Sequence, residues 1–121
     1  MSCWNSKTCN QIKGTDGTMF PPFISKETVL EAFVPFLNRS IHFNYESESH
    51  IHGLKTLKFQ LPTDLFHNSK SKDHISCYCV NKDTCTVDGV YDLSKCNNGV
   101  PLLISMPHFL DADSNLQNSV L

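Results

Sequence analysis

Six cysteines constrain this 121-residue chain more than any other feature, because their oxidation state decides which kinds of fold can form. Two of them, Cys3 and Cys9, stand near the start of the chain. The other four gather in the second half: Cys77, Cys79, Cys85 and Cys96. An even number of closely spaced cysteines indicates either a disulfide framework in an oxidising compartment or a zinc site in a reducing one.

The spacing of the cysteines favours disulfides over zinc. Structural zinc sites usually take their thiolates from pairs separated by about two to four residues. Only one residue separates Cys77 from Cys79, and Cys85 and Cys96 are far from being a second close pair. A reduced zinc-binding module therefore remains the less favoured alternative at this point.

A second signal agrees with an oxidising compartment. The tripeptide Asn38-Arg39-Ser40 is an acceptor sequence for N-glycosylation, which predicts a glycan on Asn38. The net charge is −2 and the basic residues are scattered, so nucleic acid is not expected as a partner.

No targeting segment is expected within residues 1–121. Its longest apolar stretch, from Val100 to Met106, is much shorter than the roughly 20 residues that a membrane span needs. The N-terminus lacks the basic and apolar regions of a signal peptide. We therefore expect a piece of a longer protein, in which Met1 is an internal methionine or an artefact.

The first third of the sequence predicts a turn, an extended segment and a short helix. A turn is expected at Gly14-Thr15-Asp16-Gly17, and the prolines of Phe20-Pro21-Pro22-Phe23 predict an extended segment. Ser25 is a candidate helix cap, and the apolar residues from Val29 to Val34 follow at helical spacing. Pro35 would end that helix.

The remainder predicts mainly β-structure. Ile41–Tyr45 and Leu57–Leu61 alternate apolar and polar residues, and Gly53 marks a turn between two antiparallel strands. Two further strands are expected at residues 87–93 and 100–105, separated by a turn at residues 97–99, and residues 67–76 read as an exposed loop. So few hairpins do not close a barrel, which suggests part of a larger sheet.

No catalytic or metal-binding constellation is predicted. The stretch from Asp111 to Asn115 begins like a calcium-binding loop, but Leu116 stands where such a loop requires glycine. His50 and His52 share a strand without an evident third ligand. We therefore expect neither enzyme activity nor a cofactor.

A series of short motifs runs along the chain in a fixed order. They are Cys9 followed by Gly14-Thr15-Asp16-Gly17, then Phe20-Pro21-Pro22-Phe23, Arg39-Ser40-Ile41, Leu61-Pro62, Cys77-Tyr78-Cys79 with Cys85, Leu93 to Pro101 with Cys96, and Ser105-Met106-Pro107-His108-Phe109. In this order they resemble the central ectodomain of the class B scavenger receptor family. The resemblance covers nearly the whole chain.

The resemblance implies a fold for the chain and its surroundings. The family has a large ectodomain between two transmembrane helices, built on an antiparallel β-barrel that holds an apolar tunnel. Residues 1–121 would be one fragment of that single ectodomain, the central to late part of its disulfide-stapled β core. The membrane helices and the apical helical bundle would lie outside it.

The resemblance also implies part of a disulfide pattern. Two bridges carry over, Cys9–Cys77 and Cys79–Cys85. The family partner of Cys96 would stand at position 38, where this chain has Asn38 instead. The extra cysteine, Cys3, leads to the hypothesis of a Cys3–Cys96 bridge.

The implied function is that of a membrane glycoprotein that binds and transports lipids through the tunnel, namely fatty acids, cholesterol or lipoprotein lipids. The alternative is a lysosomal membrane sorting receptor that binds an enzyme partner. The first places the chain on the extracellular side of the plasma membrane, the second on the lumenal side of the lysosomal membrane. Protein ligands would bind outside this fragment, and the lipid-contacting residues are not specified by the sequence.

Overall fold

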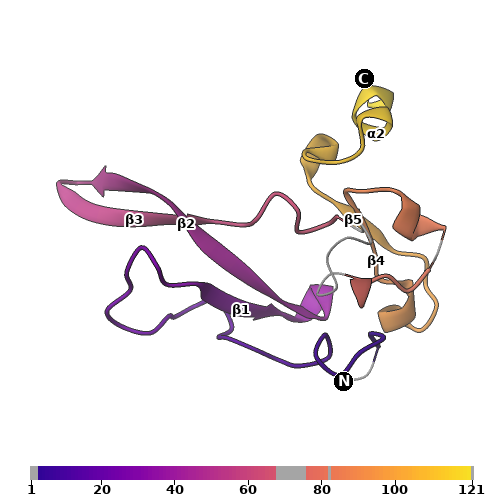
Figure 1. The fold of residues 1–121 in the computed structure, drawn as a ribbon, viewed down its shortest axis with the longest axis horizontal. Coiled ribbons are helices and arrows are strands. Elements are labelled where there is room, and N and C mark those ends of the chain that lie inside the picture. The colour runs from indigo at the N-terminus through magenta and orange to yellow at the C-terminus, as the bar shows by residue number, and fades with distance from the viewer. Residues whose placement is uncertain (1–2, 68–75, 82, 121) are drawn as a thin grey trace. The chain divides into compact units, whose positions relative to one another are not determined.

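The computed structural model describes residues 3–67, 76–81 and 83–120. The chain divides into two compact units, which are described separately below (Figure 1). The hairpin unit is Ile12–Pro62, and the disulfide unit comprises the flanking segments, described within residues 3–11 and 63–120. Most of the loop expected at residues 67–76 lies outside the described residues. The expectation of a mainly β fold with antiparallel sheets is confirmed.

The hairpin unit contains a three-stranded antiparallel sheet in the order β1-β2-β3. Strand β1 is Leu30–Val34, β2 is Arg39–Ile51 and β3 is Leu54–Gln60. A short 3-10 turn, η1 at Pro35–Leu37, joins the first two strands. Strand β1 pairs with the first part of β2 only, so the rest of β2 forms a two-stranded ribbon with β3 (Figure 1).

The helix expected before Pro35 is wrong, because residues 30–34 form strand β1. Leu30 pairs with Phe43 at one end of the ladder, and Val34 pairs with Arg39 at the other. Aromatic and β-branched residues are enriched in strands relative to helices. A helix of two turns has little stability alone, so pairing with β2 outweighs the apolar spacing that suggested it.

The turn expected at Gly53 is confirmed, and the strands beside it are longer than predicted. His52 and Gly53 have φ values of 49° and 79°, which is the backbone of a two-residue turn matched to strand twist. A register shift between Tyr45 and Ser47 interrupts the alternation of β2. Because alternation is the sequence signal of a strand, its loss hid the polar continuation of β2 up to Ile51.

In the disulfide unit the two expected strands are present but short. Strand β4 is Val90–Asp92, strand β5 is Leu103–Ser105, and they pair antiparallel. Between them lie the 3-10 turn η3 at Ser94–Asn97 and a bend at Asn98, which has a φ of 54°. The described part of the unit also contains η2 at Thr84–Thr86, η4 at Pro107–Phe109 and helix α2 at Ser114–Ser119.

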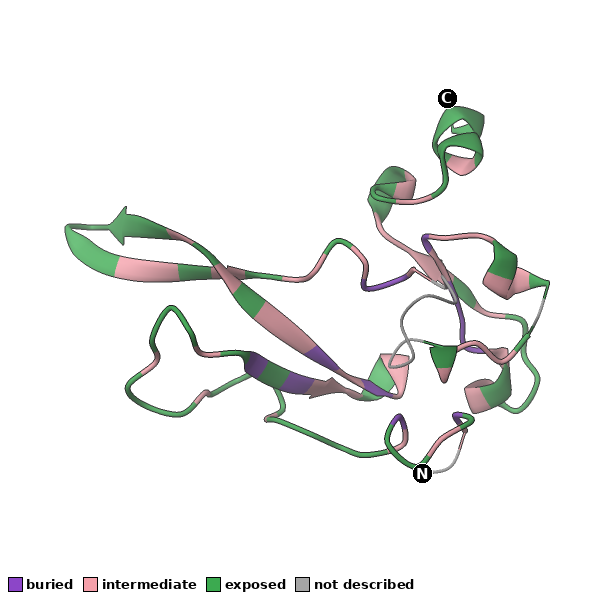
Figure 2. Ribbon diagram, in the orientation of Figure 1, coloured by how far each residue is buried: buried purple, intermediate pink, exposed green. Residues whose placement is uncertain are grey.

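Each unit has a small buried core (Figure 2). The hairpin unit buries three apolar side chains of its sheet, Leu30, Ala32 and Ile41. The disulfide unit buries a larger set: Trp4, Cys9, Leu65, Phe66, Tyr91 and Leu93. Among the described residues, every helix is too short or too polar to span a membrane.

Candidate functional site

The six cysteines form three disulfides, and all three lie in the disulfide unit. The bonded pairs are Cys3–Cys96, Cys9–Cys77 and Cys79–Cys85, with Cα–Cα distances of 5.1, 6.3 and 5.6 Å. These distances fall within the range that a disulfide spans. They are the partners named above from the family resemblance and from the surplus cysteine, and the covalent pairing remains a prediction for peptide mapping.

The disulfide unit also contains a cluster of aromatic rings that sequence reasoning missed. Trp4 follows Cys3, and its ring centroid lies 5.2 Å from that of Tyr78 at an interplanar angle of 80°. Tyr91 lies at the centre, 5.4 Å from Trp4 and 5.6 Å from Phe66. Edge-on and tilted pairs at these distances add stabilisation beyond area burial. A signal was available, since Trp4 and Tyr78 each stand next to a cysteine.

Asn5 connects three segments of the disulfide unit. Its side-chain amide donates to the carbonyl of Cys79 at 2.8 Å, and its backbone N–H donates to the carbonyl of Cys77 at 3.3 Å. The ammonium of Lys95 donates to the side-chain carbonyl of Asn5 at 2.8 Å. Residues 3–9 are therefore held to the Cys-Tyr-Cys segment by the hydrogen bonds of Asn5 as well as by the Cys9–Cys77 disulfide.

Asp92 is a buried carboxylate at the end of β4. It accepts hydrogen bonds from the backbone N–H of Ser94 at 2.8 Å and from the hydroxyl of Thr84 at 3.2 Å. Burial acts to raise the pKa of Asp92, but the hydrogen bonds from Ser94 and Thr84 outweigh it, and the net pKa is lowered. The ionised carboxylate thus joins η2 to the start of η3.

The disulfide unit is expected to lose stability in acid, because protonation of Asp92 removes the stabilisation that the ionised carboxylate provides. Because its folded pKa is lowered, the contribution is complete above the pKa of the unfolded carboxyl and is lost as the pH falls through the folded value. Asp92→Asn should cost about 1–2 kcal/mol at pH 7 and flatten the pH dependence below about pH 5. Urea titrations of both proteins at several pH values measure this. An Asp92→Asn protein with unchanged acid sensitivity would contradict it.

The Gly14-Thr15-Asp16-Gly17 motif attaches the start of the hairpin unit to the outer edge of β1. Thr15 forms a parallel bridge with Ala32. The N–H of Thr15 donates to the carbonyl of Glu31 at 3.0 Å, and the carbonyl of Thr15 accepts from the N–H of Phe33 at 2.8 Å. The carboxylate of Asp16 accepts from the hydroxyl of Thr18, which lowers the pKa of Asp16. The predicted turn is thus also an edge contact of the sheet.

Gly14 is expected to tolerate no side chain. Its φ is +81°, and an added Cβ would lie 2.1 Å from the carbonyl oxygen of Glu31. Gly14→Ala should destabilise the hairpin unit by more than about 2 kcal/mol, since backbone strain and a clash act together. Gly53 is the matched control: its φ is +79° with no atom within 4 Å, so Gly53→Ala should cost only about 1 kcal/mol. Amide exchange in β1 should be faster in Gly14→Ala than in Gly53→Ala. Equal exchange rates in the two variants would contradict the role of the clash.

The Phe20-Pro21-Pro22-Phe23 segment departs from the expected extended conformation at its last residue. Phe23 has a φ of 62°, in the left-handed region, and its side chain is 99% exposed. Proline restricts its own φ and the residue before it, but it does not restrict the residue that follows. The prediction therefore fails at Phe23.

The hairpin unit presents one apolar sheet face. Residues directly opposite in a ladder point to the same side, so the register assigns this face. It carries these side chains of the three strands: Leu30, Ala32, Val34, Arg39, Ile41, Phe43, Tyr45, Leu57 and Phe59. Burial is complete at Ala32 and Ile41 and falls to half along Phe43, Tyr45 and Phe59. We call this surface the apolar face.

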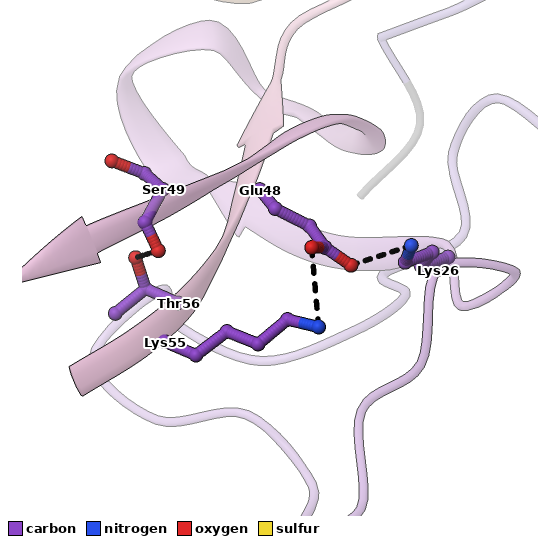
Figure 3. Close-up of polar contacts among 5 residues, drawn as sticks. All are labelled: Lys26, Glu48, Ser49, Lys55 and Thr56. Carbon is purple, nitrogen blue, oxygen red and sulfur yellow. Dashed lines mark hydrogen bonds and ion pairs between the residues drawn. The ribbon is translucent and has the colours of Figure 1, made fainter.

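A charged cluster lies at the far end of the apolar face (Figure 3). Glu48 on β2 forms ion pairs with Lys55 on β3, at 3.1 Å, and with Lys26, which comes from the loop before β1. The ammonium of Lys26 also lies 5.7 Å from the ring centroid of Tyr45. Lys26 and Lys55 lower the pKa of Glu48, and Glu48 in turn raises the pKa of Lys26.

The other sequence candidates do not assemble into a site. His50 and His52 are exposed at the β2–β3 turn, and His108 is exposed in η4. The imidazole of His67, which was not a sequence candidate, bonds to the backbone carbonyl of Asp111 at 2.9 Å. Within the described part of the chain, no three His, Cys, Asp or Glu side chains are placed to hold a metal ion, and the zinc alternative has no free thiolate there.

Comparison with known proteins decides the family. The sequence profile described as the CD36 family matches residues 1–121, the full length of the chain. The chain belongs to the CD36 family. This confirms the resemblance to class B scavenger receptors that the ordered motifs indicated.

Individual members of the CD36 family agree. Mouse lysosome membrane protein 2 is 35% identical over 117 residues, which cover 97% of this chain and 24% of that protein. Rat scavenger receptor class B member 1 is 36% identical over 118 residues, 98% of this chain and 22% of that protein. Sensory neuron membrane protein 1 of Helicoverpa armigera is 38% identical over 113 residues, which cover 93% of this chain and 21% of that protein. The chain thus spans about a quarter of the length of these relatives.

Asn38 marks where this CD36 family chain departs from the pattern expected of it. It follows η1 with a φ of 50°, between β1 and β2, and its N–H donates to the carbonyl of Pro35. The hydroxyl of Ser40, the third residue of the sequon, bonds to both the N–H and the carbonyl of Lys13, at 2.8 and 3.1 Å. The second and third residues of the sequon therefore lie in β2, and Asn38 itself lies in the tight connection before it.

Proposed function

We propose that the chain is part of the ectodomain of a membrane glycoprotein that binds and transports lipids, on the extracellular side of the plasma membrane, and that is not an enzyme. The observation that carries the proposal is the half-covered apolar face of the hairpin unit. A lipid tail gains about 0.8 kcal/mol for each CH₂ removed from water, so an apolar sheet can bind it without a catalytic group. The family relationship supports a membrane receptor.

The disulfide unit supports this role by holding its own fold in an oxidising compartment. Three bridges and an aromatic cluster stabilise a unit that has few regular elements. Small domains with little core commonly depend on such cross-links. We also propose that Asn38 carries a glycan. Glycosidase treatment of the secreted protein should lower the mass of the wild-type chain and leave the mass of Asn38→Gln unchanged.

Lipid binding is tested with the oxidised chain and two fluorescent probes, cis-parinaric acid and dehydroergosterol. We expect a saturable rise in fluorescence with at least one probe. Phe59→Ser, on the apolar face, should weaken it, whereas Phe36→Ser, at a 66% exposed side chain in η1, should not. Absence of saturable binding, or equal losses in both variants, would refute lipid binding at this face.

A second candidate is a lysosomal membrane sorting receptor that escorts an enzyme. It is favoured by the identity with a protein named lysosome membrane protein 2. Locating the full-length protein by microscopy separates the two candidates. Residence in lysosomes would favour the sorting receptor, and residence at the cell surface would favour lipid uptake.

A further inference from the structure

The segment before β1 approaches residues of the apolar face of the hairpin unit at two points. We call residues 17–29 the strap. At its start, a Cβ added to Gly17 would lie 3.9 Å from the Cβ of Ala32, which belongs to the apolar face. Further along, Lys26 lies over the ring of Tyr45 on the same face. The strap therefore comes close to the face at Gly17, beside buried Ala32, and again at Lys26, beside half-buried Tyr45.

The far end of the strap is held by charge. Lys26 pairs with Glu48, which also pairs with Lys55, and the two lysine side chains are 56% and 63% exposed (Figure 3). Three apolar side chains of the strap are exposed, Met19 at 76%, Phe23 at 99% and Val29 at 55%, whereas Phe20 and Ile24 are half-buried. A segment held by exposed ion pairs opens more readily than one held by apolar packing.

The cluster has one more positive than negative charge. Glu48 supplies one carboxylate to two ammonium groups, directly beside half-buried Tyr45, Leu57 and Phe59. A carboxylate that bridges two lysines occupies the position that an external anion would take. An amphipathic anion can replace it with its headgroup and cover the adjacent apolar side chains with its tail.

We propose that Glu48 acts as an internal competitor for an anionic lipid headgroup, which binds Lys26 and Lys55, releases the strap and places its tail on the apolar face. This inference rests on the proposed lipid binding and adds the headgroup charge, the residues that select it and the segment that moves. Lys26 and Lys55 contact the headgroup, and Glu48 sets its affinity.

Lipid selection is tested by titrating the oxidised chain with oleate and with oleyl alcohol in competition with dehydroergosterol. Glu48→Gln should tighten oleate binding by about fivefold and leave oleyl alcohol unchanged. Lys26→Met with Lys55→Met should abolish the preference for oleate. The control is Lys58→Met, a lysine on the opposite face that pairs with Glu46 and is 58% exposed. Equal oleate affinity in all variants would overturn the inference while leaving lipid binding intact.

Strap release is tested without lipid. Amide exchange in residues 17–29 should quicken severalfold in Glu48→Gln and at high salt, because screening weakens exposed ion pairs. Glu46→Gln, whose ion pair with Lys58 does not involve the strap, should leave it unchanged. Unchanged strap exchange in Glu48→Gln would overturn the role of the ion pair. If no lipid of either kind binds to the wild-type chain, both this inference and the proposed function are wrong.

Discussion

Removing the Cys9–Cys77 bridge is expected to lower the free energy of unfolding of the disulfide unit by about 4 kcal/mol. The bridge joins residues 68 apart in sequence, so its loss returns a large amount of conformational freedom to the unfolded chain. The double substitution Cys9→Ser with Cys77→Ser tests this without leaving a free thiol. Cys9 is itself buried, which adds a small loss of packing.

The matched control is the short bridge of the same unit. Cys79 and Cys85 are 6 residues apart, so Cys79→Ser with Cys85→Ser should cost only about 2 kcal/mol. Urea unfolding followed by the fluorescence of Trp4, the single tryptophan, compares the two proteins. Non-reducing peptide mapping of the wild-type chain establishes the pairing first. A free Cys96 thiol would refute the Cys3–Cys96 bond, and equal losses in both double variants would refute the loop-length argument.

The β-structure was predictable where alternation and turn chemistry agree. Leu57, Phe59 and their partner Tyr45 alternate with polar residues, and Gly53 supplies a turn residue with positive φ. The prediction failed at residues 30–34, where the apolar spacing also fits a helix. A short apolar run does not distinguish the two structures, and only the partner strand, which is not local in sequence, decides between them.

The candidate site was only partly readable from the sequence. Family resemblance supplied the partners of four cysteines, whereas the aromatic rings around Tyr91 depend on which segments the fold brings together. The cluster of Lys26, Glu48 and Lys55 was also missed. Glu48 and Lys55 become neighbours through the hairpin register, but Lys26 reaches them from a loop that has no periodic pattern.

The two units have different sources of stability, and this separates the variants described above. Every disulfide lies in the unit whose described strands, β4 and β5, are three residues each, whereas the hairpin unit relies on its strand ladder and a few buried side chains. Backbone hydrogen bonds and apolar burial do not depend on thiol oxidation. Reduction should therefore act first on the disulfide unit, and Gly14→Ala on the hairpin unit.

Leu93→Ala is expected to destabilise the disulfide unit by about 3 kcal/mol, close to the loss of a long-range disulfide. Leu93 is 0% exposed, directly after β4, so truncation leaves a cavity in a core with few residues to fill it. Its backbone N–H and carbonyl remain bonded, to Leu102 and to the N–H groups of η3, so the effect reports side-chain packing.

Leu110 provides the comparison, because it is the same residue type in the same unit but is 57% exposed. Leu110→Ala should change the free energy of unfolding by less than about 1 kcal/mol, and Leu93→Met, which keeps the volume, should cost less than about 1.5 kcal/mol. Urea unfolding of the three oxidised variants gives these values. If Leu93→Ala and Leu110→Ala prove equally stable, the disulfides alone hold this unit together and its small core contributes little.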